Sequence, residues 1–201
     1  MPPALTGVPA APQLPGAIFM KSKLLTSTAI AALAFAGVAA AATDPMVGGA
    51  AMYPGENIVQ NAMHSQDHTT LVAVVKAAGL VKTLEGPGPF TVFAPTNQAF
   101  AALPPGTIGT LLKPQNKAEL TKILTYHVVP GRLDTRMLDR DIKSGGGATT
   151  LKTVEGDTLT VRGSGKDLTV TDEKGNTARV TIPNVYQSNG VIMVVNKVLM
   201  P

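Results

Sequence analysis

The residues best suited to acid–base or metal chemistry in this chain are its three histidines: His64, His68 and His127. His127 lies seven positions after Leu120, two turns along the same apolar helix face. It fits either a core histidine, with ring nitrogens bonded to main-chain or hydroxyl groups, or a catalytic base. We favour the core, because a base needs a nucleophile or an orienting carboxylate and the sequence offers no motif for either. We therefore predict no catalytic residue.

His64 and His68 have the i, i+4 spacing with which one helix presents two zinc ligands. The polar run Ser65-Gln66-Asp67 between them indicates a break between two helices, which would separate the two rings. A closed zinc site needs about four ligands, and no third or fourth is identifiable. We prefer a solvated loop and predict no metal.

Two glycine-rich segments could hold phosphate. In Gly163-Ser164-Gly165-Lys166, however, Thr160 stands where a phosphate loop requires its first glycine, and Asp167 stands where Ser or Thr should hold magnesium. The segment is typical of a hairpin turn. The triple glycine at 145–147 is not followed by a helix start, so we predict a loop there and no cofactor.

Thr96 and Asn97 form the best-defined polar element. They follow a predicted strand, Phe90 to Ala94, that Pro95 ends. Their side chains can accept hydrogen bonds from free N–H groups at a helix start. Capping therefore explains both residues, and direct ligand contact is the alternative.

The remaining pattern changes from helical to extended along the chain. Apolar spacing predicts a helix from Asn57 and a second one that carries Leu71, Val72, Val75 and Ala78 on one face. Asp67 or Thr69 would be the N-cap of the second helix, and Gly79 would end it in a left-handed conformation. Asn116 and Glu119 have the spacing of a capping box. After residue 147 the period becomes two, which predicts an antiparallel meander, and Val191–Val195 is apolar throughout, as in a strand buried on both faces. The fold class is therefore α+β.

The N-terminal region is typical of an exported protein. Two lysines at 21 and 23, an apolar run from Ala29 and an Ala-rich end predict a signal peptide at 20–42, with a permanent anchor as the alternative. Residues 1–19 are then a mis-assigned extension before a true start at Met20. Residues 43–52 are predicted to be a flexible tail, and 53–201 a single domain.

Charge and composition exclude several classes. Loss of residues 1–42 removes two of the 17 basic residues and none of the 13 acidic ones, leaving a net charge of +2. With so small a charge, no Lys/Arg cluster, no Trp and three Tyr, nucleic acid is not an expected partner. The absence of cysteine excludes disulfides and thiol chemistry.

Three segments carry a family resemblance: Gly88–Asn97, Leu124–Gly131 and Asn189–Pro201. In content and order they are similar to the first conserved box, the Tyr-His motif and the second conserved box of the fasciclin domain family, and the likeness runs from about residue 53 to the end. The resemblance implies a twisted antiparallel β-wedge with helices packed at one end. It also implies that Tyr126 and His127 are mainly structural, with a secondary role in adhesion.

The chain departs from the family pattern in both boxes. The family usually has an acidic residue at the position of Gln98, and often His and Asp at the positions of Met193 and Asn196. These changes remove charge and weaken any charged binding site there. The candidate binding residues are therefore Thr96, Asn97, Tyr126 and His127.

The predicted signal peptide implies a secreted or periplasmic protein, and the resemblance implies a non-catalytic adhesion module. Its partner would be a cell surface, a matrix component or a protein, with no stable membrane span after signal cleavage. The alternative is a periplasmic protein that binds a small molecule between its helices and its sheet, and an enzyme comes third.

Overall fold

The computed structural model describes residues 44–201. The predicted extension at 1–19 and the predicted signal peptide at 20–42 lie outside the described residues. Within 44–201, no helix has the length and apolar character needed to cross a membrane.

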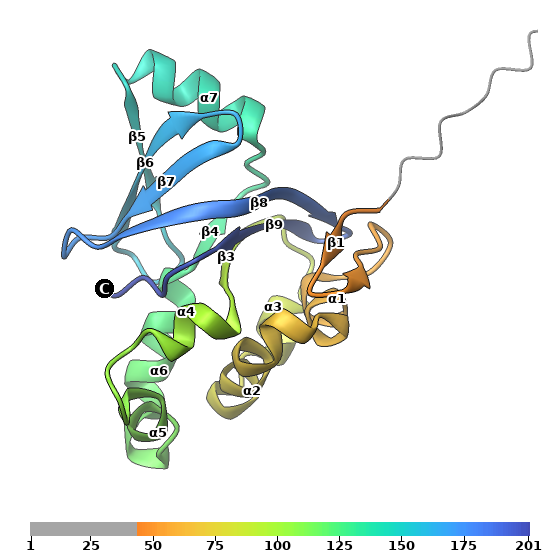
Figure 1. Ribbon diagram of the computed structural model, residues 1–201, viewed down its shortest axis with the longest axis vertical. Coiled ribbons are helices and arrows are strands. Elements are labelled where there is room, and N and C mark those ends of the chain that lie inside the picture. Colours follow the sequence, from red (N-terminus) through yellow and green to blue (C-terminus); the bar gives the residue numbers. More distant parts are fainter. Residues whose placement is uncertain (1–43) are drawn as a thin grey trace, which may run out of the picture. The chain divides into compact units, whose positions relative to one another are not determined.

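The helices fall mainly in the first half of the described chain. They are α1 (Ile58–His64), α2 (Thr69–Ala78), α3 (Val81–Leu84), α4 (Asn97–Ala101), α5 (Thr107–Leu111), α6 (Lys117–Tyr126) and α7 (Thr135–Ser144), with 3-10 turns η1 (Gln66–His68) and η2 (Pro114–Asn116). Helices α1 to α6 gather below the sheet in Figure 1, and α7 lies at its opposite end.

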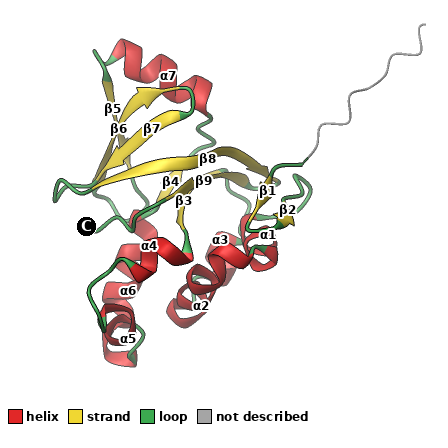
Figure 2. Cartoon of the chain, in the orientation of Figure 1, coloured by secondary structure: helices red, strands yellow, loops and turns green. Residues whose placement is uncertain are grey.

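The strands are β1 (Met46–Val47), β2 (Ala50–Ala51), β3 (Phe90–Pro95), β4 (Val128–Pro130), β5 (Ala148–Lys152), β6 (Thr158–Ser164), β7 (Asp167–Thr171), β8 (Thr177–Gln187) and β9 (Gly190–Val195). The last seven form one sheet in the order β4-β3-β9-β8-β7-β6-β5. Its neighbours are antiparallel except β3 and β9, which run parallel with Val92 opposite Ile192. Figure 2 shows the strands as one twisted layer, so the α+β fold class is confirmed.

Two apolar cores lie on opposite faces of the central strands. Ile192 and Val194 of β9 point into the core formed with helices α1 to α6. Met193 and Val195, the alternate residues, point into a second core that α7 closes with Leu138 and Ile142. Every residue of β9 is buried, which confirms the prediction of a strand covered on both faces.

The segment 43–52, predicted as a flexible tail, is instead folded from residue 46 onward. β1 and β2 pair antiparallel, Val47 and Met52 are buried, and the Gly48 carbonyl accepts a hydrogen bond from the Gln66 N–H. The two apolar side chains extend the helical core, and their burial stabilises the hairpin.

The helix ends correct one capping prediction. Gly79 adopts φ +77° at the end of α2, as predicted. The Asn116 side chain does not cap α6, because η2 leads straight into that helix and leaves Asn116 outside the extended conformation that an N-cap requires. The capping box belongs to α1, between Asn57 and Gln60.

Candidate functional site

His127 lies in the core at the C-terminal end of α6, with 3% of its surface exposed. Its Nδ1 lies 2.8 Å from the Ile123 carbonyl oxygen, and the Leu199 N–H donates to its Nε2 at 3.0 Å. These contacts fit a neutral imidazole with its proton on Nδ1. The ring thus joins α6 to the C-terminal segment.

The surroundings of His127 oppose acid–base chemistry. Burial lowers the pKa of the imidazole to about 4, although the Ile123 carbonyl and the charge of Asp172 act in the opposite direction. A general base works best with a pKa near the operating pH and with a proton within reach. Both ring nitrogens are committed to the main chain, so the geometry favours the core interpretation.

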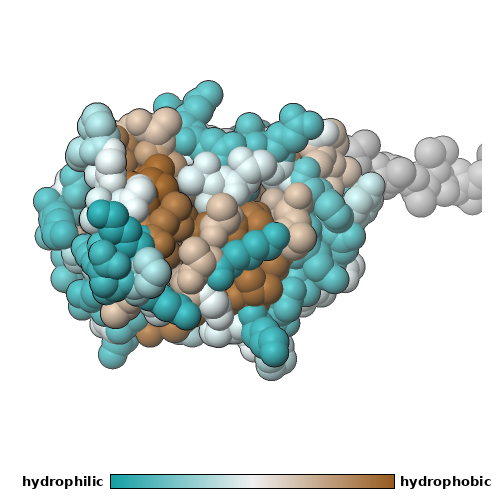
Figure 3. Space-filling model, turned by 90° about the horizontal axis from the view of Figure 1, so that it is seen from below, coloured by the Kyte–Doolittle hydropathy of each residue, from teal (hydrophilic) through white to brown (hydrophobic). Residues whose placement is uncertain are grey.

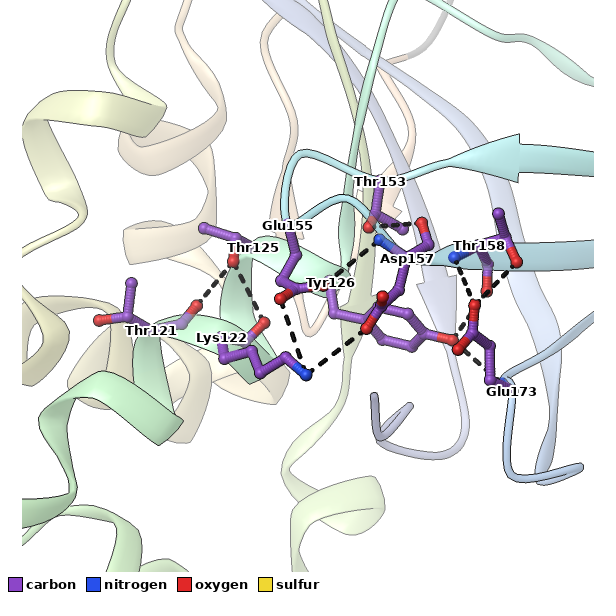
Figure 4. A network of polar contacts seen from close by, with 9 residues as sticks. All are labelled: Thr121, Lys122, Thr125, Tyr126, Thr153, Glu155, Asp157, Thr158 and Glu173. Carbon is purple, nitrogen blue, oxygen red and sulfur yellow. Dashed lines mark hydrogen bonds and ion pairs between the residues drawn. The ribbon is translucent and has the colours of Figure 1, made fainter.

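Tyr126 is fully buried and joins three segments, as Figure 4 shows. Its hydroxyl donates to the Thr158 carbonyl oxygen at 2.9 Å and accepts from the Glu173 N–H at 3.1 Å. Burial raises the pKa of the phenol to about 12. The Glu173 carboxylate accepts in turn from the N–H and hydroxyl of Thr158, both at 3.0 Å.

A surface ion-pair group borders this junction in Figure 4. Lys122 on α6 lies 3.7 Å from a Glu155 carboxylate oxygen and 3.5 Å from one of Asp157. Both acids belong to the loop between β5 and β6, so the pairs hold that loop near α6. The contacts are partly exposed, and such pairs contribute at most about 1 kcal/mol each.

Thr96 and Asn97 lie at the start of α4. Thr96 is the N-cap and accepts from the Ala99 N–H at 3.3 Å. Asn97 reaches another helix: its Oδ1 accepts from the Thr70 N–H at 2.9 Å, and its Nδ2 donates to the Gln66 carbonyl oxygen at 2.8 Å. It thereby caps α2, whose own N-cap residue, His68, makes no side-chain capping bond.

The four predicted site residues do not form one cluster. Asn97 bonds to the start of α2, Tyr126 to β6 and the β7–β8 turn, and His127 to the C-terminal segment. The polar atoms of their side chains are all engaged within the protein. The arrangement connects secondary-structure elements and offers no shared ligand position.

The histidine pair is separated as the polar break predicted. His64 is exposed and lies 3.4 Å from a Glu56 oxygen, whereas His68 is buried with its Nδ1 2.8 Å from the Ser65 hydroxyl. Within 44–201, no three residues of metal-binding type come together. Burial lowers the pKa of His68.

The two glycine-rich segments occur as turns. The segment 163–166 comprises the end of β6 and the two-residue turn, Gly165 and Lys166, that leads into β7. The Gly165 N–H donates to the Asp139 carboxylate of α7 at 2.8 Å. The Asp139 carboxylate thus accepts from a main-chain N–H that a phosphate loop would offer to its phosphate.

Sequence reasoning missed two further asparagines that cap distant helices. Asn189 accepts from the Ile58 N–H of α1 at 3.0 Å and donates to the Leu84 and Gly86 carbonyl oxygens. Asn184, at φ +58°, accepts from the Thr135 N–H of α7 at 2.9 Å. The only local signal was the Asn-Gly pair at 189–190, which also fits a simple turn.

The apolar hollow between the helices and the sheet is small. It has a volume of about 40 Å³ and is lined by residues that include Val72, Val75, Leu84, Leu124 and Val128. Figure 3 shows apolar side chains gathered on the face seen from below, the side on which the helices lie. Ligand pockets typically measure about 300–1,000 Å³, so the hollow does not accommodate a typical small-molecule ligand.

Comparisons with known proteins agree with this geometry. The family model for the fasciclin domain matches residues 66–201. Protein sll1483 of Synechocystis sp. is 48% identical over 144 residues, covering 72% of this chain and 73% of that protein. The cell surface glycolipoprotein MPB83 of Mycobacterium bovis is 35% identical over 164 residues, covering 82% and 64%. A FAS1 domain pair from the insect cell adhesion molecule Fasciclin I superposes with a TM-score of 0.65 at 16% identity, covering 73% and 51%.

Proposed function

The chain belongs to the fasciclin domain family, and on that premise we propose that it is an exported, non-catalytic adhesion module. Its partner is a cell surface, a component of an extracellular matrix, or another protein. Two of the similar proteins, a cell surface glycolipoprotein and a cell adhesion molecule, support this proposal by their names. The signal peptide predicted at 20–42 supports export.

The observation that carries the proposal is the structural use of the motif residues. The ring nitrogens of His127 and the hydroxyl of Tyr126 bond main-chain groups of distant segments. Polar groups used in this way position elements of the fold. Contact with a partner then falls to the surface, where a single copy binds weakly and gains strength by display in many copies.

Binding of a small molecule is the alternative. The apolar hollow between the helices and the sheet is too small for such a ligand. A groove of about 250 Å³, however, lies between α4 and the C-terminal segment. Ala102, Asn176, Lys197 and Met200 are among its lining residues. If the protein binds a small molecule, this groove is where we expect the molecule to bind.

Two measurements discriminate between these functions. Beads carrying many copies of the mature protein should adhere to cells or envelope fragments of the source organism, while beads carrying an unrelated protein of similar charge should not. A thermal-shift screen of metabolites should leave the melting temperature unchanged. Absence of adhesion, together with a metabolite that raises the melting temperature by several degrees, would replace the adhesion proposal with the alternative.

A further inference from the structure

One face of the sheet formed by β5, β6, β7 and β8 is polar and uncovered within the described residues. Along these strands alternate side chains point toward α7, among them Leu159, Val161, Leu168 and Val170, and all four are fully buried. The residues between them point to the opposite side, and none of those on β6 and β7 is buried. Figure 1 shows α7 beside these strands.

A row of threonines crosses this polar face. In the strand registers Thr150 lies opposite Thr160, Thr160 opposite Thr171, and Thr171 opposite Thr177. Each of four neighbouring strands thus contributes one hydroxyl, and at a strand spacing of about 4.8 Å the row is roughly 14 Å long. The hydroxyls of Thr171 and Thr177 lie 3.0 Å apart.

The next row places two arginines on either side of a threonine. Thr169 of β7 lies opposite Arg162 of β6 and Arg179 of β8. The Cα atoms of the two arginines are therefore about 10 Å apart, twice the strand spacing. Both arginines are exposed, as is Lys152 at the sheet edge. The face therefore presents three cations beside a line of hydroxyls.

The opposing charge on this face is small and exchangeable. Asp167 lies 2.5 Å from an Arg179 nitrogen, with the two side chains 79% and 62% exposed. An exposed pair contributes at most about 1 kcal/mol, so a ligand carboxylate can replace it. Glu173, in the turn after β7, is already bonded to Thr158.

The side chains of this face select one ligand chemistry. Arginine pairs with a carboxylate or a phosphate through two parallel hydrogen bonds. Threonine hydroxyls exchange hydrogen bonds with other hydroxyls, which an acidic polysaccharide carries and polyphosphate lacks. No aromatic residue lies in β5, β6 or β7 to stack against bases or neutral sugar rings. We propose that the Thr–Arg face, defined by Thr150, Thr160, Thr171, Arg162, Thr169 and Arg179, binds an acidic polysaccharide that bears carboxylate groups. This inference deepens the proposed function and rests on it for the partner's place at a cell surface.

The test uses polygalacturonate, with its methyl ester as an uncharged probe of the same backbone. Binding to the mature protein is measured by titration calorimetry and affinity electrophoresis. Polygalacturonate should bind and the ester should bind at least tenfold more weakly. The variant R162Q/R179Q should lose at least tenfold in affinity, and T160V about threefold.

The matched control is K113Q/K117Q, which removes two exposed charges on the helical side. It should bind within twofold of the wild type. An equal loss in both double variants, tight binding of the methyl ester, or binding of inorganic polyphosphate in place of polygalacturonate would overturn the inference. Unchanged circular dichroism and melting temperature show that each variant is folded.

Adhesion to cells separates this inference from the proposed function. If R162Q/R179Q adheres as well as the wild type, the Thr–Arg face is not the contact surface and the module remains adhesive by another route. If the wild type does not adhere at all, the proposed function fails, whereas tight polygalacturonate binding that depends on both arginines would still support the chemistry of the face.

Discussion

Replacement of His127 by glutamine should change how the stability of the protein depends on pH. Burial lowers the pKa of this imidazole from 6.5 to about 4. The unfolded chain therefore binds a proton near pH 6.5 that the folded chain takes up only near pH 4. Between these values the unfolded state holds more protons than the folded state. The free energy of unfolding therefore has its full value above about pH 6.5 and decreases as the pH falls toward 4.

The size of this effect follows from the shift. At 1.36 kcal/mol per pKa unit, a shift from 6.5 to about 4 corresponds to about 3 kcal/mol. About 2 kcal/mol of that is lost between pH 7 and pH 4.5. Since a small domain has a stability of about 5–15 kcal/mol, this loss is readily measured.

The assay is urea unfolding of the wild type and of H127Q at pH 7 and pH 4.5. At pH 7 the variant should be less stable by about 1–3 kcal/mol, because the Leu199 N–H or the Ile123 carbonyl loses its buried partner. Its stability should then fall less on acidification than that of the wild type, by about 2 kcal/mol. Burial also lowers the pKa of His68, but that contribution is common to both proteins and cancels in the comparison.

Equal pH dependence in the two proteins would refute this reasoning, as would an imidazole of His127 that titrates near 6.5 by NMR. If the wild type catalysed a reaction at a measurable rate and a well-folded H127A variant did not, the non-catalytic assignment would be refuted as well.

Three further substitutions, the last with a matched control, test other contacts. N97A should destabilise the protein by about 1–2 kcal/mol in urea unfolding, because the Thr70 N–H at the start of α2 loses its cap; an unchanged midpoint would contradict the capping role. Y126F should cost about 1–3 kcal/mol, since its hydroxyl bonds two main-chain groups, and in the wild type this phenol should ionise only near pH 12 in an absorbance titration. G190A should lower the melting temperature sharply, because a new Cβ would clash with the Phe90 carbonyl oxygen, far closer than van der Waals contact. G109A, in an open helical position, should instead raise stability by about 0.5–1 kcal/mol, and the same shift in both would refute the packing explanation.

The sequence predicted those features that depend on local pattern. The left-handed Gly79, the turn at 163–166 and the strand at 191–195 follow from residue type or periodicity within a few positions. The α+β class follows from the change of period along the chain. The core position of His127 was expected from its spacing on one helix face together with the lack of a motif for a catalytic partner.

The features that were missed depend on contacts between distant residues. Asn97 looked like a local cap, but it caps a helix 27 positions earlier, and Asn189 caps one 131 positions earlier. The β1–β2 hairpin looked like a tail, because the side chains that bury Val47 and Met52 lie far along the chain. The parallel pairing of β3 with β9 likewise leaves no signal in either strand's own pattern.

These long-range contacts also explain why the interior is a poor position for ligand chemistry. Asn97, Asn184 and Asn189 each satisfy N–H groups at the start of a helix, and Tyr126 and His127 satisfy main-chain groups at the sheet and the C-terminal segment. A ligand that displaced one of these side chains would leave a buried polar group unpaired, at a cost of about 1–3 kcal/mol each. The exposed Thr–Arg face carries no such cost, because its hydroxyls and guanidinium groups exchange water or weak surface pairs for a partner. Binding at this surface is therefore compatible with the fold, whereas binding at the motif residues would compete with it.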